Sequence, residues 1–80
     1  MPEIQILARY QEDDLVCEIT CENKEYWFVD TYRTTEDSDP VWLNNTGSLT
    51  TYAEAFDAFR LDLDCFFGKE FHPTMLVRNK

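Results

Sequence analysis

Few residues in this sequence are cysteines or histidines, the types that most often form structural zinc sites and act in nucleophilic catalysis. A zinc site with four ligands would need all of its thiols and its one imidazole: Cys17, Cys21, Cys65 and His72. The alternating pattern around Cys17 and Cys21 predicts a β-strand, in which residues four apart lie ~13 Å apart along the axis. Thiolates on one zinc ion lie within ~4 Å of each other, and a Cys17–Cys21 disulfide needs a similarly short distance. We therefore expect both cysteines to be small core residues, and we predict neither a metal site nor a bound cofactor.

No combination of residues in the sequence indicates an active site. His72 stands before Pro73 in a predicted turn, where a solvated or loosely packed imidazole is the usual case. Gly47 and Gly68 stand alone, so the sequence lacks a glycine-rich loop of the kind that binds nucleotide phosphates. Catalysis needs a nucleophile, a base or a metal in convergent geometry. We therefore expect that the protein is not an enzyme.

Carboxylates are the most abundant chemical group in the chain. Sixteen acidic residues stand against seven basic ones, which gives a formal net charge of −9. This charge disfavours direct binding to nucleic acid or to an anionic membrane, and it favours a basic protein partner. The carboxylates fall into groups along the chain: Glu12, Asp13 and Asp14; Glu22 and Glu25; Glu36, Asp37 and Asp39; Glu54, Asp57, Asp62 and Asp64.

Two interpretations of these acidic groups stay open. A calcium loop is disfavoured, because the stretch from Glu36 to Pro40 lacks a mid-loop glycine and ends in proline. The groups either keep a small domain soluble or contact a basic groove on a partner. For the second interpretation the candidate partner-binding residues are Glu12, Asp13, Asp14, Glu36, Asp37, Asp39, Asp57 and Asp64.

The elements that position these groups begin with a predicted sheet. Residues 3–10 and 15–21 alternate apolar and polar side chains around a polar turn, which predicts a hairpin. Residues 26–34 are rich in aromatic and β-branched side chains and predict a third strand. Its apolar side chains alternate onto both faces, so it is either a central, shielded strand or part of an aromatic contact patch. Residues 74–79 predict the last strand, and residues 41–43 only a short extended piece.

Residues 52–70 predict one amphipathic helix. Thr51 and Glu54 have the spacing of a capping box, and Gly68 is a natural stop. Apolar residues recur at steps of three and four and form a stripe that would cover the sheet: Tyr52, Phe56, Phe59, Leu63, Phe66 and Phe67. Leu61 and Cys65 fall outside the stripe among acidic residues. They are either ordinary exposed residues or a dimer face, with a Cys65–Cys65 bridge across a two-fold axis.

Together these elements predict an α+β fold in a single domain over residues 1–80. The expected architecture is a four-stranded, mostly antiparallel sheet in the order βββαβ, with one amphipathic helix packed on one face. The N-terminus lacks a signal-peptide pattern, and no apolar run approaches the ~18 residues that a membrane span needs. An odd number of cysteines without dense spacing favours a reducing compartment. We therefore expect a cytoplasmic protein.

A short, acidic, aromatic-rich α+β chain without catalytic residues resembles the small anti-CRISPR proteins that phages encode against host defence. The resemblance covers the length, the charge and the βββαβ layout of the whole chain and rests on no diagnostic motif. It implies binding to a CRISPR effector in the host cytoplasm, with the carboxylates of residues 12–14, 36–39 and 57–64 taking the place of DNA phosphates. The alternative is an antitoxin-like or adaptor module that dimerises through Leu61 and Cys65.

Overall fold

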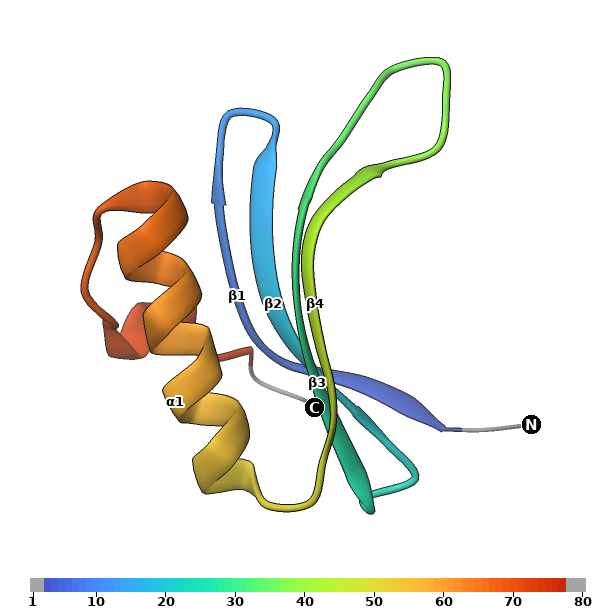
Figure 1. Ribbon diagram of the computed structural model, residues 1–80, viewed down its shortest axis with the longest axis vertical. Coiled ribbons are helices and arrows are strands. Elements are labelled where there is room, and N and C mark those ends of the chain that lie inside the picture. Colours follow the sequence, from blue (N-terminus) through green and yellow to red (C-terminus); the bar gives the residue numbers. More distant parts are fainter. Residues whose placement is uncertain (1–2, 78–80) are drawn as a thin grey trace.

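The computed structural model describes residues 3–77, which form a twisted four-stranded sheet with a helix on one face (Figure 1). All neighbouring strands are antiparallel, in the spatial order β1-β2-β3-β4. The predicted fold class, an α+β fold with a four-stranded antiparallel sheet and one helix, is confirmed. The elements are β1 (Ile4–Glu12), β2 (Leu15–Glu22), β3 (Tyr26–Arg33), β4 (Val41–Leu49), α1 (Tyr52–Asp62), the π-helical turn η1 (Leu63–Phe67) and the 3₁₀ turn η2 (Pro73–Met75).

The fourth strand is not the segment that the sequence predicts. It runs over residues 41–49, before the helix, so the order of elements is ββββα and the predicted order βββαβ is wrong. Asn44 and Asn45 have low strand propensity. Their side chains nevertheless bond to Asp62 and Asp30, which fixes this segment beside β3. The sequence signal was weak because these bonds join residues far apart in the chain.

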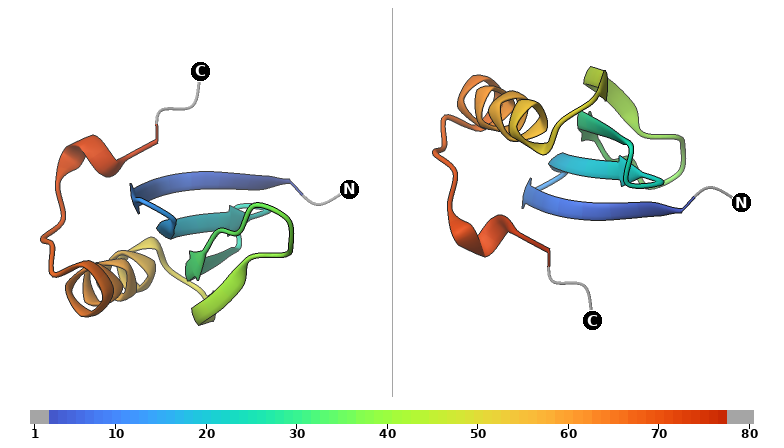
Figure 2. Two further views of the ribbon diagram at one scale, coloured as in Figure 1. Left: turned by 90° about the horizontal axis from the view of Figure 1, so that it is seen from above. Right: turned by 90° about the horizontal axis from the view of Figure 1, so that it is seen from below.

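The segment expected as the last strand forms a 3₁₀ turn at its start. Pro73 has no amide hydrogen and a fixed φ, which suits the first position of a short helix. Leu76 then makes a single bridge with Ala8, and the Val77 amide donates to the Leu7 carbonyl at 2.9 Å. Figure 2 shows this segment returning beside β1, the opposite edge of the sheet from β4. The rest of the predicted strand, residues 78–79, lies outside the described residues.

The helix begins at the predicted capping box and ends at the predicted glycine stop. The Thr51 hydroxyl accepts a hydrogen bond from the Glu54 amide at 3.2 Å and donates one to the Glu54 carboxylate at 2.9 Å. At the other end, the last turn widens into η1 and stops at Gly68, whose φ of 62° is left-handed. These two ends therefore set the length of the helix that packs on the sheet.

The core lies between the helix and the sheet, but its helical side differs from the predicted stripe. Phe59 and Leu63 are fully buried as predicted, whereas Tyr52 and Phe66 remain 43% and 37% exposed. Asp62 takes a buried position that the prediction gave to apolar residues alone. The core residues are Ala8, Cys17, Ile19, Val29, Ala55, Phe59, Leu63 and Met75. Cys17 and Cys21 are both buried, which confirms their interpretation as core residues.

Candidate protein-binding surfaces

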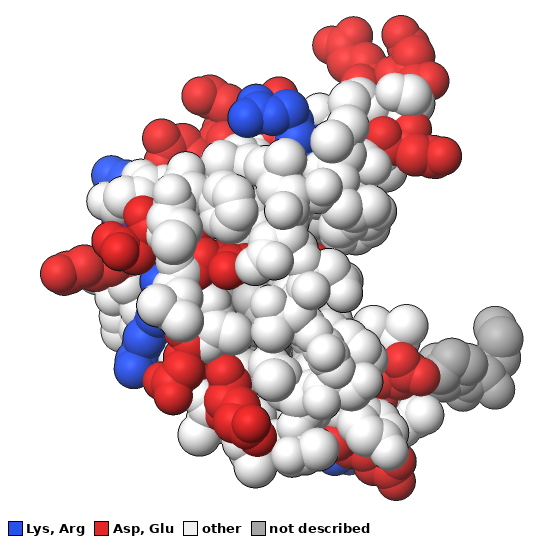
Figure 3. Space-filling model, viewed as in Figure 1, with Lys and Arg blue, Asp and Glu red and all other residues white. Residues whose placement is uncertain are grey.

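The sheet face opposite α1 has no helix over it among residues 3–77. Figure 3 shows that the molecular outline is hollowed on this side, and we call it the open face. The strand registers assign to it the even-numbered residues of β2 and β3 and their cross-strand partners. Several large apolar side chains on it are exposed: Ile4 62%, Ile6 36%, Tyr26 45% and Trp42 57%. The strand order places β3 between β2 and β4, which confirms the interpretation as a central strand, and the aromatic contact patch stays a prediction.

The upper part of the open face is built on an aromatic pair. The Tyr32 and Trp42 rings meet edge to face with their centroids 4.8 Å apart, and the two residues are cross-strand partners on β3 and β4. Tyr32 is also the cross-strand partner of Val16, which is fully buried although it points away from α1. This part of the open face is thus packed and ordered before any partner arrives.

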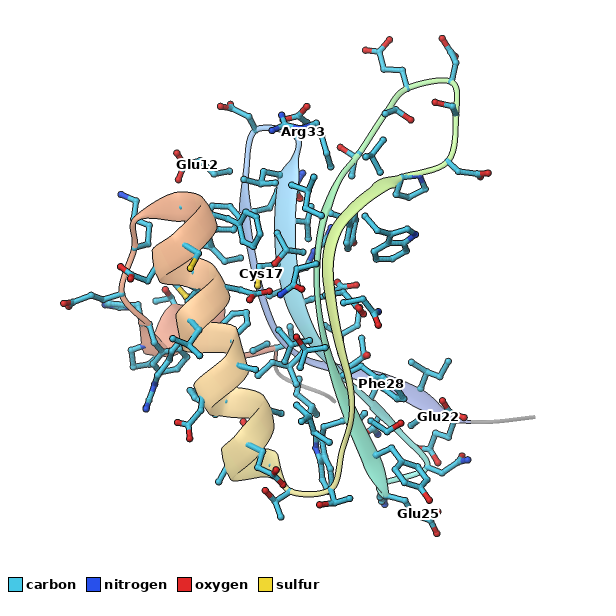
Figure 4. All side chains as sticks on the ribbon, viewed as in Figure 1. Glu12, Cys17, Glu22, Glu25, Phe28 and Arg33 are labelled. Atoms are coloured by element: carbon cyan, nitrogen blue, oxygen red, sulfur yellow. The ribbon has the colours of Figure 1, made fainter. Side chains whose placement is uncertain are left out.

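The lower part of the open face depends on a glycine. The Phe28 ring lies so close over Gly47 that a β-carbon at Gly47 would overlap the ring. Figure 4 shows Phe28 on the side of the sheet away from α1, with Glu22 and Glu25 beyond it toward the β2–β3 turn. The absence of a side chain at Gly47 therefore lets the aromatic ring lie flat across β4.

A row of polar residues crosses the middle of the open face, one from each strand. Their registers align Arg9 with Glu18, Glu18 with Asp30, and Asp30 with Asn45. The Arg9 Nε lies 3.8 Å from the Glu18 Oε2, and the Asn45 amide donates to Asp30. Burial raises the pKa of both carboxyls, against the lowering effects of Arg9 on Glu18 and of the Asn45 hydrogen bond on Asp30. The nearby protein groups thus compensate these two negative charges incompletely.

The structure brings two of the predicted acidic groups to one end of the sheet. The turn between β1 and β2 adjoins residues 34–40, since the Thr34 amide donates to the Asp14 carbonyl at 2.7 Å. Arg33 forms an ion pair with Asp14 at 2.9 Å. Figure 3 shows these carboxylates at the top of the molecule. We call this the acidic end; its members are Glu12, Asp13, Asp14, Glu36, Asp37 and Asp39.

The helical members of the predicted set lie elsewhere. Asp57 and Asp64 are exposed on α1 and η1, on the other side of the sheet from the open face, and Asp57 pairs with Arg60 at 3.8 Å. Leu61 is 66% exposed and Cys65 is also exposed, so both are at the surface as the sequence predicted. The eight predicted partner-binding residues therefore form two surfaces rather than one.

Sequence reasoning placed Asp62 among the surface carboxylates, and this is wrong. Its side chain is buried and accepts hydrogen bonds from the Thr31 hydroxyl at 2.7 Å and from the Asn44 amide at 3.0 Å. The neighbouring Cys17 thiol is desolvated, and burial raises its pKa to about 12. One signal was available: Asp62 lies seven residues after Ala55 and three after Phe59, on the face that packs against the sheet. The network joins α1, β3 and β4, which gives it a structural role.

A surface cavity of about 350 Å³ lies between the helix and the segment that follows it. Its wall includes the Arg60 guanidinium, which lies 5.9 Å from the Phe71 ring centroid and 5.2 Å from that of Phe56. Arg60 and Lys69 are balanced there by Asp64 and Glu70. The cavity thus has no net charge with which to select an ionic ligand.

His72 begins the 3₁₀ turn, where its Nδ1 accepts a hydrogen bond from the Thr74 amide at 3.3 Å. Among residues 3–77, no three Cys, His, Asp or Glu side chains lie in a group that could hold a metal ion. In the same part of the chain, none of the helices is long and apolar enough to cross a membrane. No family model, curated protein or solved structure matches this chain. The functional argument therefore rests on the surfaces described above.

Proposed function

We propose that this protein binds the basic surface of a nucleic-acid-binding protein and blocks that surface by charge mimicry. The favoured target class is a CRISPR effector complex, which would make the protein an anti-CRISPR that prevents binding of target DNA. The observation that carries the proposal is the acidic end, where two separate chain segments bring six acidic residues to one end of the sheet, and among the described residues Arg33 forms an ion pair with one of them, Asp14. Their negative charge attracts the Lys and Arg side chains that otherwise pair with phosphates.

The mechanism is competition between carboxylates and phosphates for the same cations. Long-range attraction speeds the encounter and weakens as salt is added. Affinity then needs desolvated anchors, for which aromatic side chains are preferred. Trp42 stands two residues after the acidic loop of residues 34–40 and is 57% exposed. An apolar anchor thus lies beside the negative charges.

The test measures target-DNA binding by representative CRISPR effectors of different types, with and without this protein. Reversal of the loop charges (Glu36→Lys, Asp37→Lys and Asp39→Lys) should weaken inhibition by at least about tenfold, because attraction at the contact becomes repulsion. The loop is preferable to Asp14, whose ion pair with Arg33 supports the fold. A matched control reverses Asp57 and Asp64 on the helical side and should leave most of the inhibition intact. Unchanged DNA affinity across all effector types would contradict the proposal.

A second candidate function, a self-associating regulatory module, is favoured by the exposure of Leu61 and Cys65 on the helical side. Light scattering with and without reductant tests it directly. A dimer that depends on oxidation and disappears in the Cys65→Ser variant would support a Cys65–Cys65 bridge. A monomer under both conditions would reject this candidate.

A further inference from the structure

We infer that the open face is a docking surface for an amphipathic α-helix with basic flanks, supplied by the partner protein. The inference deepens the proposed function, on which it rests for the positive charge of the partner. A sheet packs stably with helices on one face or on both, and α1 covers only one face here. The open face has the three features that such a helix requires: an apolar floor, acidic margins and incompletely compensated charges between them.

The floor has two apolar parts, one on each side of the polar row. Its exposed members come from three strands: Ile6 on β1, Tyr26 on β3 and Trp42 on β4. Phe28 adds to the lower part, because Gly47 leaves room for its ring. Exposed apolar patches with polar margins are typical of a protein-binding site. The apolar stripe of an amphipathic helix would cover it.

The margins are acidic at both ends of the hollow. The loop with Glu36, Asp37 and Asp39 lies at one end, and Glu22 and Glu25 lie at the other (Figures 3 and 4). A helix whose apolar stripe lies on the floor would direct the Lys and Arg residues at its two ends toward these margins. The charge on the open face therefore selects a basic helix over an acidic or neutral one.

The polar row supplies a third contact in the middle of the floor. Glu18 and Asp30 are half-buried neighbours, and their nearest basic group, Arg9, lies 3.8 Å from Glu18. Burial raises the pKa of both carboxyls, because desolvation disfavours their charged forms. One Lys or Arg on the docked helix could reach this pair and complete the compensation. The row thus gives the apolar floor a position at which a cation is preferred.

Two other occupants fit the open face less well. A second copy of this chain has the same net charge of −9, so its acidic margins would repel those of the first copy. An added strand could pair with the outer edge of β1, which Leu76 and Val77 already occupy at Ala8 and Leu7, or with that of β4, where register shifts interrupt the strand at two places. Regular pairing with β3 between these bulges is limited to Asn44, Asn45 and Thr46. A helix on the sheet face avoids both problems.

The test uses two synthetic peptides of 18 residues with the same Leu and Lys composition. One has the order of an amphipathic helix, and the other has a scrambled order that keeps the charge but breaks the apolar stripe. Binding to the intact protein is measured by titration calorimetry and by amide chemical-shift changes. We expect the amphipathic peptide to bind at least about tenfold tighter than its isomer, with the largest shift changes at Ile6, Phe28 and Trp42.

Matched variants locate the binding surface. Trp42→Ala combined with Ile6→Ser should reduce binding of the amphipathic peptide to the level of the scrambled one. Leu61→Ser removes an even more exposed apolar side chain from α1 and should change the affinity less than about twofold. Trp42→Ala alone provides the same comparison if the double variant unfolds. Equal affinity for the two peptides, shift changes confined to α1 or to the β4 edge, or a dimer that occupies the open face would overturn the inference.

The peptide assay and the DNA-competition assay can each contradict one proposal without contradicting the other. If the protein blocks DNA binding by an effector but binds both peptides equally, the proposed function is supported and the inference of a docking surface is contradicted. If the protein affects none of the effectors but binds the amphipathic peptide through Trp42, the docking surface is supported and the proposed function is contradicted.

Discussion

The two faces of the same sheet differ in what covers them and therefore in what they can do. On β3, Val29 and Thr31 face α1 and are fully buried, whereas Phe28 and Tyr32, one residue away, lie on the open face and are only partly covered. The covered face holds the apolar core whose burial drives folding. The open face keeps apolar side chains in contact with water, which favours binding once a partner covers them. Substitutions on the two faces should therefore separate stability from binding.

The largest expected effect is on the covered face. Phe59→Ala should lower the free energy of unfolding by about 3–5 kcal/mol, because it removes a fully buried ring and leaves a cavity. Trp42→Ala, on the open face, should lower it by less than about 1 kcal/mol. Urea denaturation of both variants measures the difference, and Phe59→Leu gives a milder change if Phe59→Ala is unfolded. Similar losses from Phe59→Ala and Trp42→Ala would contradict the division between the faces.

A smaller but still large effect is expected at the buried carboxylate that joins the helix to the covered face. Asp62→Ala should cost about 2–3 kcal/mol, since the Thr31 hydroxyl and the Asn44 amide lose their acceptor. The control on the same helix is Asp57→Ala, whose exposed carboxylate has one ion pair at 3.8 Å and should contribute less than about 0.5 kcal/mol. Equal losses in chemical denaturation of the two variants would show that the Asp62 network is dispensable.

Packing on the open face can be tested at its glycine. Gly47→Ala should cost about 1–3 kcal/mol, because the new methyl group overlaps the Phe28 ring. A second substitution, Phe28→Ala, removes the overlap, so the double variant should lose less than the sum of the two single losses. Ser48→Ala at the next residue serves as the control and should change the stability by less than about 0.5 kcal/mol. If the loss of unfolding free energy in the double variant equals the sum of the two single losses, the contact between Gly47 and the Phe28 ring is contradicted.

The smallest effect concerns the charge in the polar row. A carboxyl with a raised folded pKa favours folding when protonated, and this contribution is lost as the pH rises through that pKa. Asp30→Asn should therefore raise the free energy of unfolding at neutral pH, measured by urea denaturation, by under about 1 kcal/mol at this partly exposed site. The stability gain of the Asp30→Asn variant should disappear at pH values below 3.8, the ordinary pKa of aspartate. Asp37→Asn in the exposed loop controls for the change in net charge, and an equal gain from it would contradict the local effect.

Much of the fold was predictable because its determinants are local. The alternation in residues 4–12 and 15–22, the Thr51 cap and the Gly68 stop each act within a few residues of where they stand. The fourth strand was not predictable in this way. Asn44 and Asn45 form a strand because Asp62 and Asp30, distant in sequence, accept hydrogen bonds from their amides.

The candidate surfaces show the same difference between features set locally in the sequence and features set by distant residues. Charge and exposure could be predicted for Glu12, Asp37, Leu61 and Cys65, because acidic and off-stripe residues usually stay at the surface. For Asp62 the helical periodicity indicates only the side that faces the sheet; the two donors that satisfy its buried carboxylate come from distant strands and could not be predicted.

The sequence by itself determined the net charge of −9, the α+β class and the presence of an amphipathic helix, since composition and short-range periodicity are properties of the chain alone. Only the tertiary structure decided which acidic groups meet at one end of the sheet, which strand completes it and which face stays open. Those outcomes depend on cross-strand register and on hydrogen bonds between distant residues, which arise only when the whole chain has packed.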